Sequence, residues 1–352
     1  MNNKILVVGN GFDLHHGMKT NYMDMLIRIR GVLLGDANFP EIDIPTRTVI
    51  KEYENNSLLK YLLAALKNQY YEKTWIDMES EIKELVNKLL LFLDAERTKT
   101  FDGNANNEYK YGYTNKISSR ERALVENLIC IFEKKRYDYI IKKRFITTLH
   151  DIDIMEIMKA LNIEMEKLEQ IVKFYLQSVE PLYRNPDKYV TDSQIQSINP
   201  DYVISFNYTN TMEELYGINK DDIFYIHGDL NKDNIVLGYD DRNESSRDII
   251  FKKFYRRIIK HTDNIDVNRF FKSDDLGGYI KYDLYFYGHS LDVSDEDILC
   301  RLIKDSDHVN VFYMDQIDYS NKVLNLIQLL SKEEVIDKIN SGEFNFIEIK
   351  SN

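Results

Sequence analysis

The sequence predicts an α/β protein: a Rossmann-like parallel sheet flanked by helices and interrupted by a large α-helical insertion. The prediction rests on an apolar strand and glycine turn near the N-terminus, a long helical stretch in the middle, and strands that alternate with helices after Pro200. We expect residues 1–45 and 196–352 to form the α/β domain and residues 46–195 to form the helical insertion.

The first strand has no polar face, since Ile5-Leu6-Val7-Val8 is apolar throughout, as in a central strand of a parallel sheet. Gly9 and Gly11 follow directly, and glycine lets backbone N–H groups come close to an anion. Such turns bind the pyrophosphate of dinucleotides. The full G-x-G-x-x-G pattern is missing because position 14 is leucine, so a tight turn without a ligand is the alternative.

The middle of the chain is predicted to be mainly helical. A helix is expected from about Tyr22 to Leu33, and apolar residues at spacings of three and four then form amphipathic stripes. These stripes are Trp75, Met78, Ile82, Leu85, Leu89 and Leu93; Leu124, Leu128, Ile131 and Phe132; and Ile157, Leu161, Met165, Leu168, Val172 and Leu176.

Short runs of β-branched and aromatic residues predict strands after Pro200, with helical patterns between several of them. The expected strands are Tyr202–Phe206, Ile223–Ile226, Ile235–Leu237, Leu284–Tyr287, Val309–Met314 and Phe344–Ile349. Ser331 and Glu334 have capping-box spacing and predict the start of the last helix. Strands that alternate with helices imply a parallel sheet, whose ligand site lies at the carboxyl ends of the strands.

Composition narrows the class of protein. The chain has 352 residues, 43% of them hydrophobic, which is enough for a packed core. A net charge of −12 argues against broad binding of nucleic acid or anionic membranes, and two isolated cysteines indicate a reducing compartment. The longest apolar runs are far shorter than the ~18 residues of a membrane span, so we expect a cytoplasmic protein without a membrane partner.

Small and polar residues follow five of the predicted strands, where sheet geometry brings the strand ends to one crevice. The segments are Gly9-Asn10-Gly11-Phe12-Asp13, Asn207-Tyr208-Thr209-Asn210-Thr211, His227-Gly228-Asp229, Gly238-Tyr239-Asp240-Asp241 and Gly288-His289-Ser290-Leu291-Asp292. This convergence is a stronger argument for a site than any single motif.

Each of these residues also has a purely structural interpretation. Asn207 and Thr211 suit the cap of a helix near Met212, and Asp13 suits a helix cap or an acceptor for a ribose hydroxyl. His227 is either a hydrogen-bonded structural histidine or a general base at the sheet edge. Ser290 could cap a turn, and we expect His289 to be a side-chain contact and not a catalyst.

We predict no metal site, because adjacent His15 and His16 do not share a helix face and no carboxylate lies at ligand spacing. A basic stretch lies on a predicted helix, and we expect it to form a solvent-exposed face of that helix. The alternative is that it contacts phosphates or nucleic acid. Its residues are Lys252, Lys253, Arg256, Arg257 and Lys260.

Several motifs occur in an order that resembles the bacteriophage abortive-infection AbiH family. They are GNGFDLHHGMKTNY, then Trp75-Ile76-Asp77-Met78-Glu79, then SFNYTNTME, IHGDL, LGYD and YGHSLDVSDEDI, which together run from the first strand to about Asp297. The resemblance implies a role in anti-phage defence.

The same order more distantly resembles the SIR2 (sirtuin) group of NAD-binding proteins, which implies a SIR2/DHS-like fold. Gly9-x-Gly11 with Gly17-Met18 is similar to the sirtuin GAG…GIP segment, and Ser205–Thr209 to TQNID. His227-Gly228 is similar to the catalytic His-Gly, and Gly288–Leu291 to GTSL.

The SIR2 resemblance implies that Asn207 positions water or the ribose, and that His227 is the base. The nucleotide-binding residues predicted within the motifs are Gly9, Asn10, Gly11, Phe12, Asp13, His16, Thr209, Gly288, His289 and Ser290. The chain lacks the four cysteines of the sirtuin zinc ribbon, which argues against a protein deacylase, and Thr209 replaces the sirtuin aspartate near the nicotinamide amide.

We therefore expect a defence protein that binds NAD or a related nucleotide and hydrolyses its nicotinamide N-glycosidic bond. The first alternative is a nucleotide-sensing or partner-binding module without turnover, which Thr209 favours. The second is an effector on nucleic acid, which the acidic composition disfavours. A phage-derived trigger and a homo-oligomer are the other expected partners, with the helical insertion as the contact surface.

Overall fold

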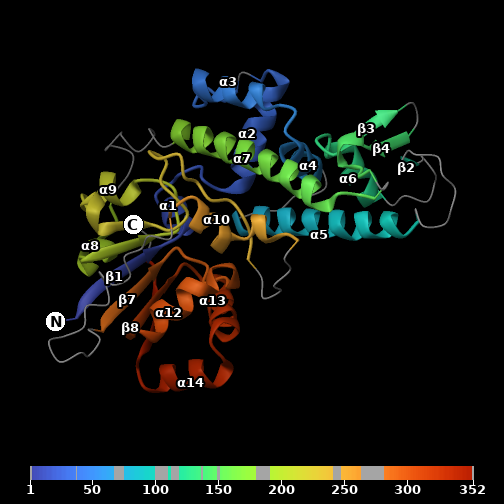
Figure 1. Cartoon of the computed structure of the whole chain (residues 1–352). Coiled ribbons are helices and arrows are strands. Elements are labelled where there is room, and N and C mark those ends of the chain that lie inside the picture. The colour runs from blue at the N-terminus through green and yellow to red at the C-terminus, as the bar shows by residue number, and fades with distance from the viewer. Residues whose placement is uncertain are drawn as a thin grey trace.

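The structure is a computed structural model that describes residues 2–36, 38–66, 75–99, 110–111, 119–135, 138–148, 151–179, 191–240, 247–262 and 281–350. Figure 1 shows two parts, a sheet with its covering helices and a group of longer helices beside it. The α/β class predicted from the sequence is confirmed by the six-stranded parallel sheet and its flanking helices.

The main sheet has the order β6-β5-β1-β7-β8-β9, and every neighbouring pair is parallel. Its strands are β1 (Asn3–Val8), β5 (Tyr202–Ser205), β6 (Ile223–Tyr225), β7 (Tyr282–Tyr287), β8 (Ser306–Tyr313) and β9 (Phe344–Glu348). Counted along the chain within this sheet alone, that order is 3-2-1-4-5-6, the doubly wound order of the Rossmann fold. The apolar first strand is central, as its composition predicts.

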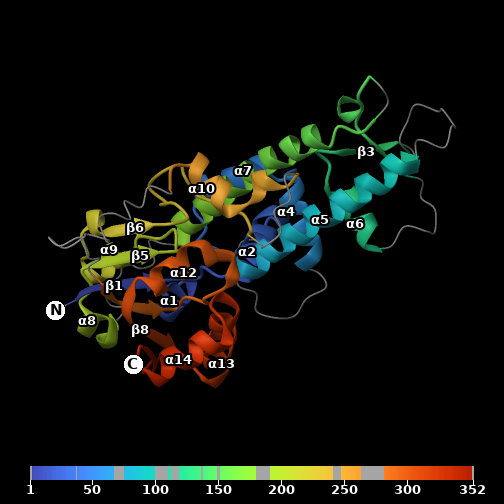
Figure 2. The same ribbon diagram turned by 60° about the horizontal axis from the view of Figure 1, so that its bottom comes forward.

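The two faces of the sheet are covered by different helices, because successive strand residues point to opposite sides. Ile5 and Val7 pack in one apolar cluster with α12, α13 and α14, whereas Leu6 and Val8 pack in another with α1, α8 and α9. These helices are α12 (Glu296–Lys304), α13 (Gln316–Leu329), α14 (Lys332–Asn340), α1 (Asn10–His15), α8 (Ser193–Ile198) and α9 (Thr211–Tyr216). Figure 2 shows α13 and α14 next to β8.

The second part is mainly helical. Its helices are α2 (Tyr22–Leu34), α3 (Ile44–Glu52), α4 (Ser57–Leu66), α5 (Trp75–Lys99), α6 (Ser119–Asn127) and α7 (Ile154–Val179). The predicted stripe residues of α5 from Met78 to Leu93 and those of α7 from Ile157 to Leu176 are buried in one core. α2 packs into that core as well, although it precedes residue 46.

This helical part also contains a small antiparallel sheet that the sequence did not predict. Its order is β2-β4-β3, formed by β2 (Lys110–Tyr111), β3 (Phe132–Lys135) and β4 (Asp138–Ile141). The predicted helical stripe from Leu124 to Phe132 was therefore wrong in its second half, because α6 ends at Asn127 and Phe132 begins β3. Apolar spacing alone does not separate a helix end from a short buried strand.

The predicted strand Ile235–Leu237 was also wrong. These residues are buried, but Ile235 and Leu237 pack in the core of the helical part, and the Leu237 N–H donates to Glu169 Oε1 at 2.9 Å. A carboxylate on a helix satisfies this backbone group, so no neighbouring strand is needed. The following segment leads through the short 3₁₀ turn Ile249–Phe251 to α10 (Lys253–Ile259).

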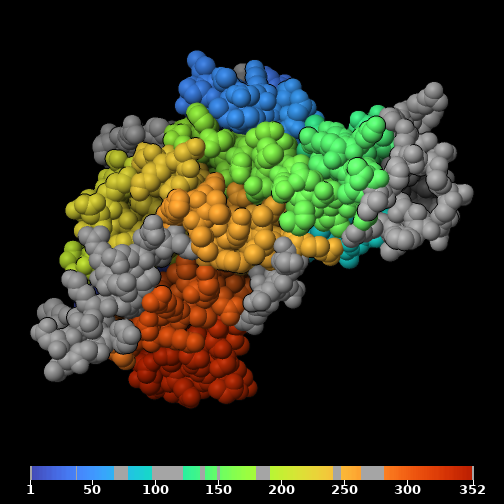
Figure 3. Space-filling model, viewed as in Figure 1, coloured from blue at the N-terminus to red at the C-terminus, as the bar shows by residue number. Residues whose placement is uncertain are grey.

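α10 lies where the two parts meet. In Figure 3 the orange segment that contains α10 lies between the green surface of α7 and the red C-terminal helices. Within the described ranges, no helix combines the length and apolar character that a membrane span requires.

Candidate functional site

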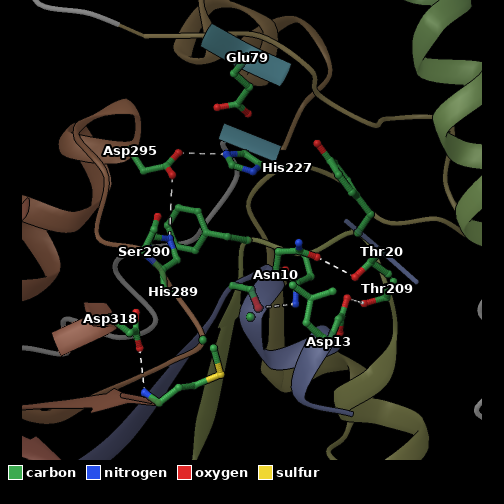
Figure 4. Close-up of a pocket in the computed structure, with 18 of the residues that line it drawn as sticks. Asn10, Asp13, Thr20, Glu79, Thr209, His227, His289, Ser290, Asp295 and Asp318 are labelled. Carbon is green, nitrogen blue, oxygen red and sulfur yellow. Dashed lines mark hydrogen bonds and ion pairs between the residues drawn. The ribbon is translucent and has the colours of Figure 1, made fainter. Parts of the chain in front are cut away.

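One cavity of about 260 Å³ lies at the carboxyl ends of β1, β5 and β7. The order of strands along the chain reverses here, since β5 and β6 extend the sheet on one side of β1, and β7 to β9 extend it on the other. Ligands of open α/β sheets bind at such a switch point. Figure 4 shows residues of the glycine turn, the β5 and β6 loops and the β7 loop directed into this cavity.

The cavity brings together most of the residues predicted from the sequence. Those that line it are Gly9, Asn10, Gly11, Asp13, Asn207, Thr209, His227, Gly288, His289 and Ser290. The segment after Leu237 does not take part: Asp240 lies outside the lining, and Asp241 lies outside the described residues. Phe12 and His16 also lie outside the lining.

Phe12 and His16 hold α1 against the sheet instead of facing the cavity. His16 is buried, its Nδ1 is 2.7 Å from the carbonyl oxygen of Phe12, and its Nε2 is 2.7 Å from the Tyr216 hydroxyl. Both ring nitrogens are therefore engaged within the protein. Burial lowers the pKa of His16, which favours the neutral ring that this pair of contacts requires.

The glycines of the site allow two backbone segments to touch. The Gly11 N–H donates to Gly288 O at 2.9 Å, and a Cβ on Gly288 would lie 2.0 Å from Phe12 N. A Cβ on Gly9 would lie 2.8 Å from the Cα of His289. The sequence suggested an anion cradle, but the N–H groups of Gly9 and Gly11 are already bonded to the end of β7. In the structure, glycine is required at these positions because the two loops pack closely against each other.

Asp13 is enclosed by hydroxyl groups. Thr209 Oγ1 donates to Asp13 Oδ2 at 2.7 Å, and Thr211 Oγ1 donates to Asp13 Oδ1 at 2.9 Å. The carboxylate thus links α1 to the loop after β5 and to the first residue of α9. The predicted cap of α9 by Asn207 or Thr211 was wrong, because the N-cap is Asn210 and the Thr211 hydroxyl bonds to Asp13.

Two asparagines lie at the floor of the cavity. Asn207 Nδ2 donates to Gly9 O at 2.9 Å, so the amide fixes the glycine turn, and no described residue bonds to its Oδ1. Asn10 Oδ1 accepts from Thr20 Oγ1 at 2.8 Å, while its buried Nδ2 has no hydrogen-bond partner among the described residues. One amide group of each side chain therefore remains available to a ligand.

A carboxylate lies between two buried histidines. Asp295 Oδ1 is 3.3 Å from His227 Nε2, and Asp295 Oδ2 is 3.9 Å from His289 Nε2 (Figure 4). The Leu291 N–H donates to His289 Nδ1 at 3.0 Å, which places the proton of the neutral His289 ring on Nε2. The His227 contact is long and poorly aligned, as catalytic contacts often are before a ligand binds.

Burial controls the protonation of both histidines. It lowers the pKa of His289 to about 4, and it lowers the pKa of His227, where the charge of Lys253 adds to the effect. Burial also disfavours the ionised form of Asp295, but Lys253 and His227 hold the pKa of this carboxyl well below its ordinary value. The cavity therefore contains neutral histidines beside a charged carboxylate, which is the arrangement of a general base and its stabilising partner.

Lys253 on α10 connects this carboxylate to the helical part. Its Nζ is 3.1 Å from Asp295 Oδ1 and 2.9 Å from Glu79 Oε2, and Glu79 belongs to α5. Burial favours a neutral amine, but Asp295 and Glu79 raise the pKa of Lys253 above its ordinary value. Burial raises the pKa of Glu79 to about 7, despite the opposing effect of Lys253. The side chains of Trp75, Ile76 and Asp77, from the same motif, lie outside the described part.

A second buried lysine, Lys322, lines the cavity beside Asp318, which Figure 4 shows far from Glu79. Lys322 Nζ lies 2.9 Å and 3.0 Å from the two carboxylate oxygens of Asp318, one helical turn earlier on α13. Each lysine of the lining thus has a carboxylate partner. The lining carboxylates are Asp13, Glu79, Asp295 and Asp318.

The basic stretch before the α10 C-terminus is not a solvated face, so that prediction was wrong. Lys252, Lys253, Arg256 and Arg257 are at most 4% exposed, and Arg256 Nη2 is 2.7 Å from Glu169 Oε1 on α7. These cations join the two parts of the protein and do not present a surface to nucleic acid. Helical periodicity cannot reveal this, because carboxylates distant in sequence decide it.

Sequence reasoning missed the roles of Asp295, Lys253, Glu79 and Lys322. Asp295 and Glu79 lie within the quoted motifs YGHSLDVSDEDI and Trp75–Glu79, which was the available signal. Nothing in the local sequence distinguishes Lys253 or Lys322 from surface lysines.

Comparison with models of known protein families matches residues 5–315 to the family described as Bacteriophage abortive infection AbiH. Neither a search of curated proteins nor a search of solved structures gave a match. The matched range contains the glycine turn, the helical part, the sheet as far as β8 and most of the cavity lining, and it ends before α13, α14 and β9.

Proposed function

This chain belongs to the bacteriophage abortive infection AbiH family, which indicates a role in abortive infection, and from that premise we propose that its cavity binds NAD and hydrolyses the bond to nicotinamide. The observation that supports the proposal best is the buried His227–Asp295 pair in a cavity at the switch point of a doubly wound sheet. Nucleotides bind at this place in such sheets.

The charge of the cavity suits this chemistry. Departure of nicotinamide leaves positive charge on the ribose, and the carboxylates of Asp295 and Glu79 lie where they can stabilise it. A diphosphate would be repelled by those carboxylates, so we expect the nicotinamide ribose at this end. Away from these two carboxylates, Lys322, which pairs with Asp318, is the cation of the lining that we expect nearest to the phosphates.

In the proposed reaction, water adds to the ribose C1′ as the bond to nicotinamide breaks, which gives ADP-ribose, nicotinamide and a proton. Asn207 holds the water through its free Oδ1. His227, with its own proton on Nε2 facing Asp295, accepts the proton of the water at Nδ1. Asp295 stabilises the resulting imidazolium. A phage-derived trigger or self-association would control this activity through the helical part.

Nicotinamide release from NAD by the purified full chain tests the proposal, with phage extract as a possible activator. We expect His227→Gln to lower the rate roughly 10²- to 10⁴-fold. His308→Gln is the matched control, because His308 lies on β8 with its side chain 54% exposed and outside the cavity lining. Asn207→Ala should also abolish release, although it additionally removes the bond to Gly9.

The same assay distinguishes the alternative function. Thr209, where sirtuins have an aspartate, donates to Asp13 and is occupied within the protein, which favours a sensor without turnover. Saturable NAD binding with no nicotinamide release, with or without phage extract, would support that sensor. Release that His227→Gln leaves unchanged would contradict the assigned base.

A further inference from the structure

The carboxylates that line the cavity differ in what they are free to bind. Both oxygens of Asp13 accept threonine hydroxyls. Both oxygens of Asp318 contact Lys322, and Oδ2 also accepts the Met314 N–H. Asp295 lies among Lys253 and the two histidines. These three carboxylates are therefore engaged by the protein itself.

Glu79 is the exception among the carboxylates of the described lining. Its side chain is buried, and its Oε2 is 2.9 Å from Lys253 Nζ, but no described residue bonds or pairs with its Oε1. Figure 4 shows the Glu79 carboxylate directed towards Asp295 and His227. Oε2 is fully buried and forms no hydrogen bond to a described residue, and a buried carboxylate is costly unless a ligand or water donates to it.

We propose that Glu79, carried by α5 of the helical part, receives a hydrogen bond from a hydroxyl of the nicotinamide ribose, so that the helical part forms one wall of the substrate site. The inference rests on the proposed nucleotide site. Glu79 repels phosphate and requires a hydrogen-bond donor, and carboxylates accept ribose hydroxyls in other dinucleotide sites. Burial raises the pKa of Glu79 to about 7, which agrees with a carboxylate whose loss of hydration is only partly offset by Lys253.

This contact is tested by measuring how tightly the unmodified protein and a Glu79 variant each bind two ligands that differ in their ribose hydroxyls. Two carbocyclic NAD analogues serve as probes, because neither releases nicotinamide readily. One keeps both hydroxyls on the ring that bears nicotinamide, and the other lacks them. We expect Glu79→Gln to weaken the binding of the hydroxylated analogue roughly 10- to 100-fold, which is the range for a hydrogen bond to a charged group. The affinity for the analogue without hydroxyls should change by no more than about 2-fold.

The matched control is Glu84→Gln, since Glu84 lies on the same helix with its side chain 51% exposed. If Glu79→Gln does not fold, Glu79→Asp keeps a carboxylate for the pair with Lys253 and shortens the side chain by one methylene group, which draws its oxygens back from the cavity. Glu79→Asp should likewise weaken the binding of the hydroxylated analogue more than the binding of the other.

The outcomes separate this inference from the proposed function. Equal weakening of both analogues by Glu79→Gln would overturn the hydroxyl contact and leave the nucleotide site intact. Failure of the unmodified protein to bind either analogue would overturn the nucleotide site together with this inference. Loss of the hydroxyl preference in Glu79→Gln, combined with no nicotinamide release from NAD, would support the contact and refute only the hydrolysis.

Discussion

Gly288 is the position where a single added methyl group should do the most damage to the floor of the cavity. Its φ is +64°, and a Cβ there would lie 2.0 Å from Phe12 N, 2.5 Å from Gly11 C and 2.8 Å from Phe12 Cα. All three atoms belong to the backbone of the glycine turn and α1. No side-chain rotation can relieve the contact, so Gly288→Ala must push the turn away from the end of β7.

Gly288→Ala should lower the unfolding free energy for two reasons, backbone strain and overpacking, and the chain offers a control for the strain. Gly217 has φ +65° but nothing within 4 Å of its Cβ position, so Gly217→Ala incurs only the left-handed backbone strain of about 1–2 kcal/mol. Gly288→Ala adds an overpacking cost of roughly 1–3 kcal/mol or more. We therefore expect Gly288→Ala to lower the unfolding free energy by about 2–5 kcal/mol.

Urea unfolding followed by circular dichroism measures both variants, and NAD binding reports the shape of the cavity. Gly288→Ala should show a lower unfolding midpoint than Gly217→Ala and should also lose NAD binding. Equal midpoints for the two variants would refute the argument, because they would mean that the loops separate without cost.

Two further predictions concern the buried charges. The pKa of His289 is about 4 in the folded protein and 6.5 for an ordinary histidine. Between these two pH values the unfolded chain therefore binds more protons than the folded protein. The stability that the neutral His289 ring contributes is consequently lost as the pH falls from 6.5 towards 4. The unfolding free energy of the unmodified protein relative to His289→Gln should therefore fall by about 2 kcal/mol between pH 7 and pH 5, as measured by urea unfolding; a constant difference would contradict the neutral buried ring. Lys253→Met should cost roughly 3–5 kcal/mol, because it leaves Glu79 and Asp295 without their shared cation, and adding Glu79→Gln should recover part of that loss. Thermal unfolding at one pH tests this, and additive losses would show that Lys253 and Glu79 are not coupled.

Local signals in the sequence were sufficient for most of the sheet. The apolar run Ile5–Val8 forms the central strand, and the other strands predicted after Pro200 form, except Ile235–Leu237. Ser331 caps α14 through the Glu334 N–H at 3.1 Å, as its spacing predicted. Strand ends, caps and turns depend on neighbours a few residues away, which a single sequence displays.

Two of the wrong predictions share a physical cause. Ile235–Leu237 has the composition of a strand, but the carboxylate of Glu169 on α7 satisfies its backbone. The basic residues of α10 have the spacing of a solvated face, but Glu79, Glu169 and Asp295 surround them. In each case the deciding partner lies far away in the chain.

The sequence by itself determined a parallel sheet whose polar strand ends meet, and it identified the loops that supply Asn207, His227 and His289 to the cavity. Only the tertiary structure decided which groups complete the site. Asp295 lies beside His227, and Lys253 joins it to Glu79 on a helix of the other part. The reason is that the protonation and availability of a buried group depend on every charge within a few ångströms, and chain folding, not sequence spacing, sets those distances.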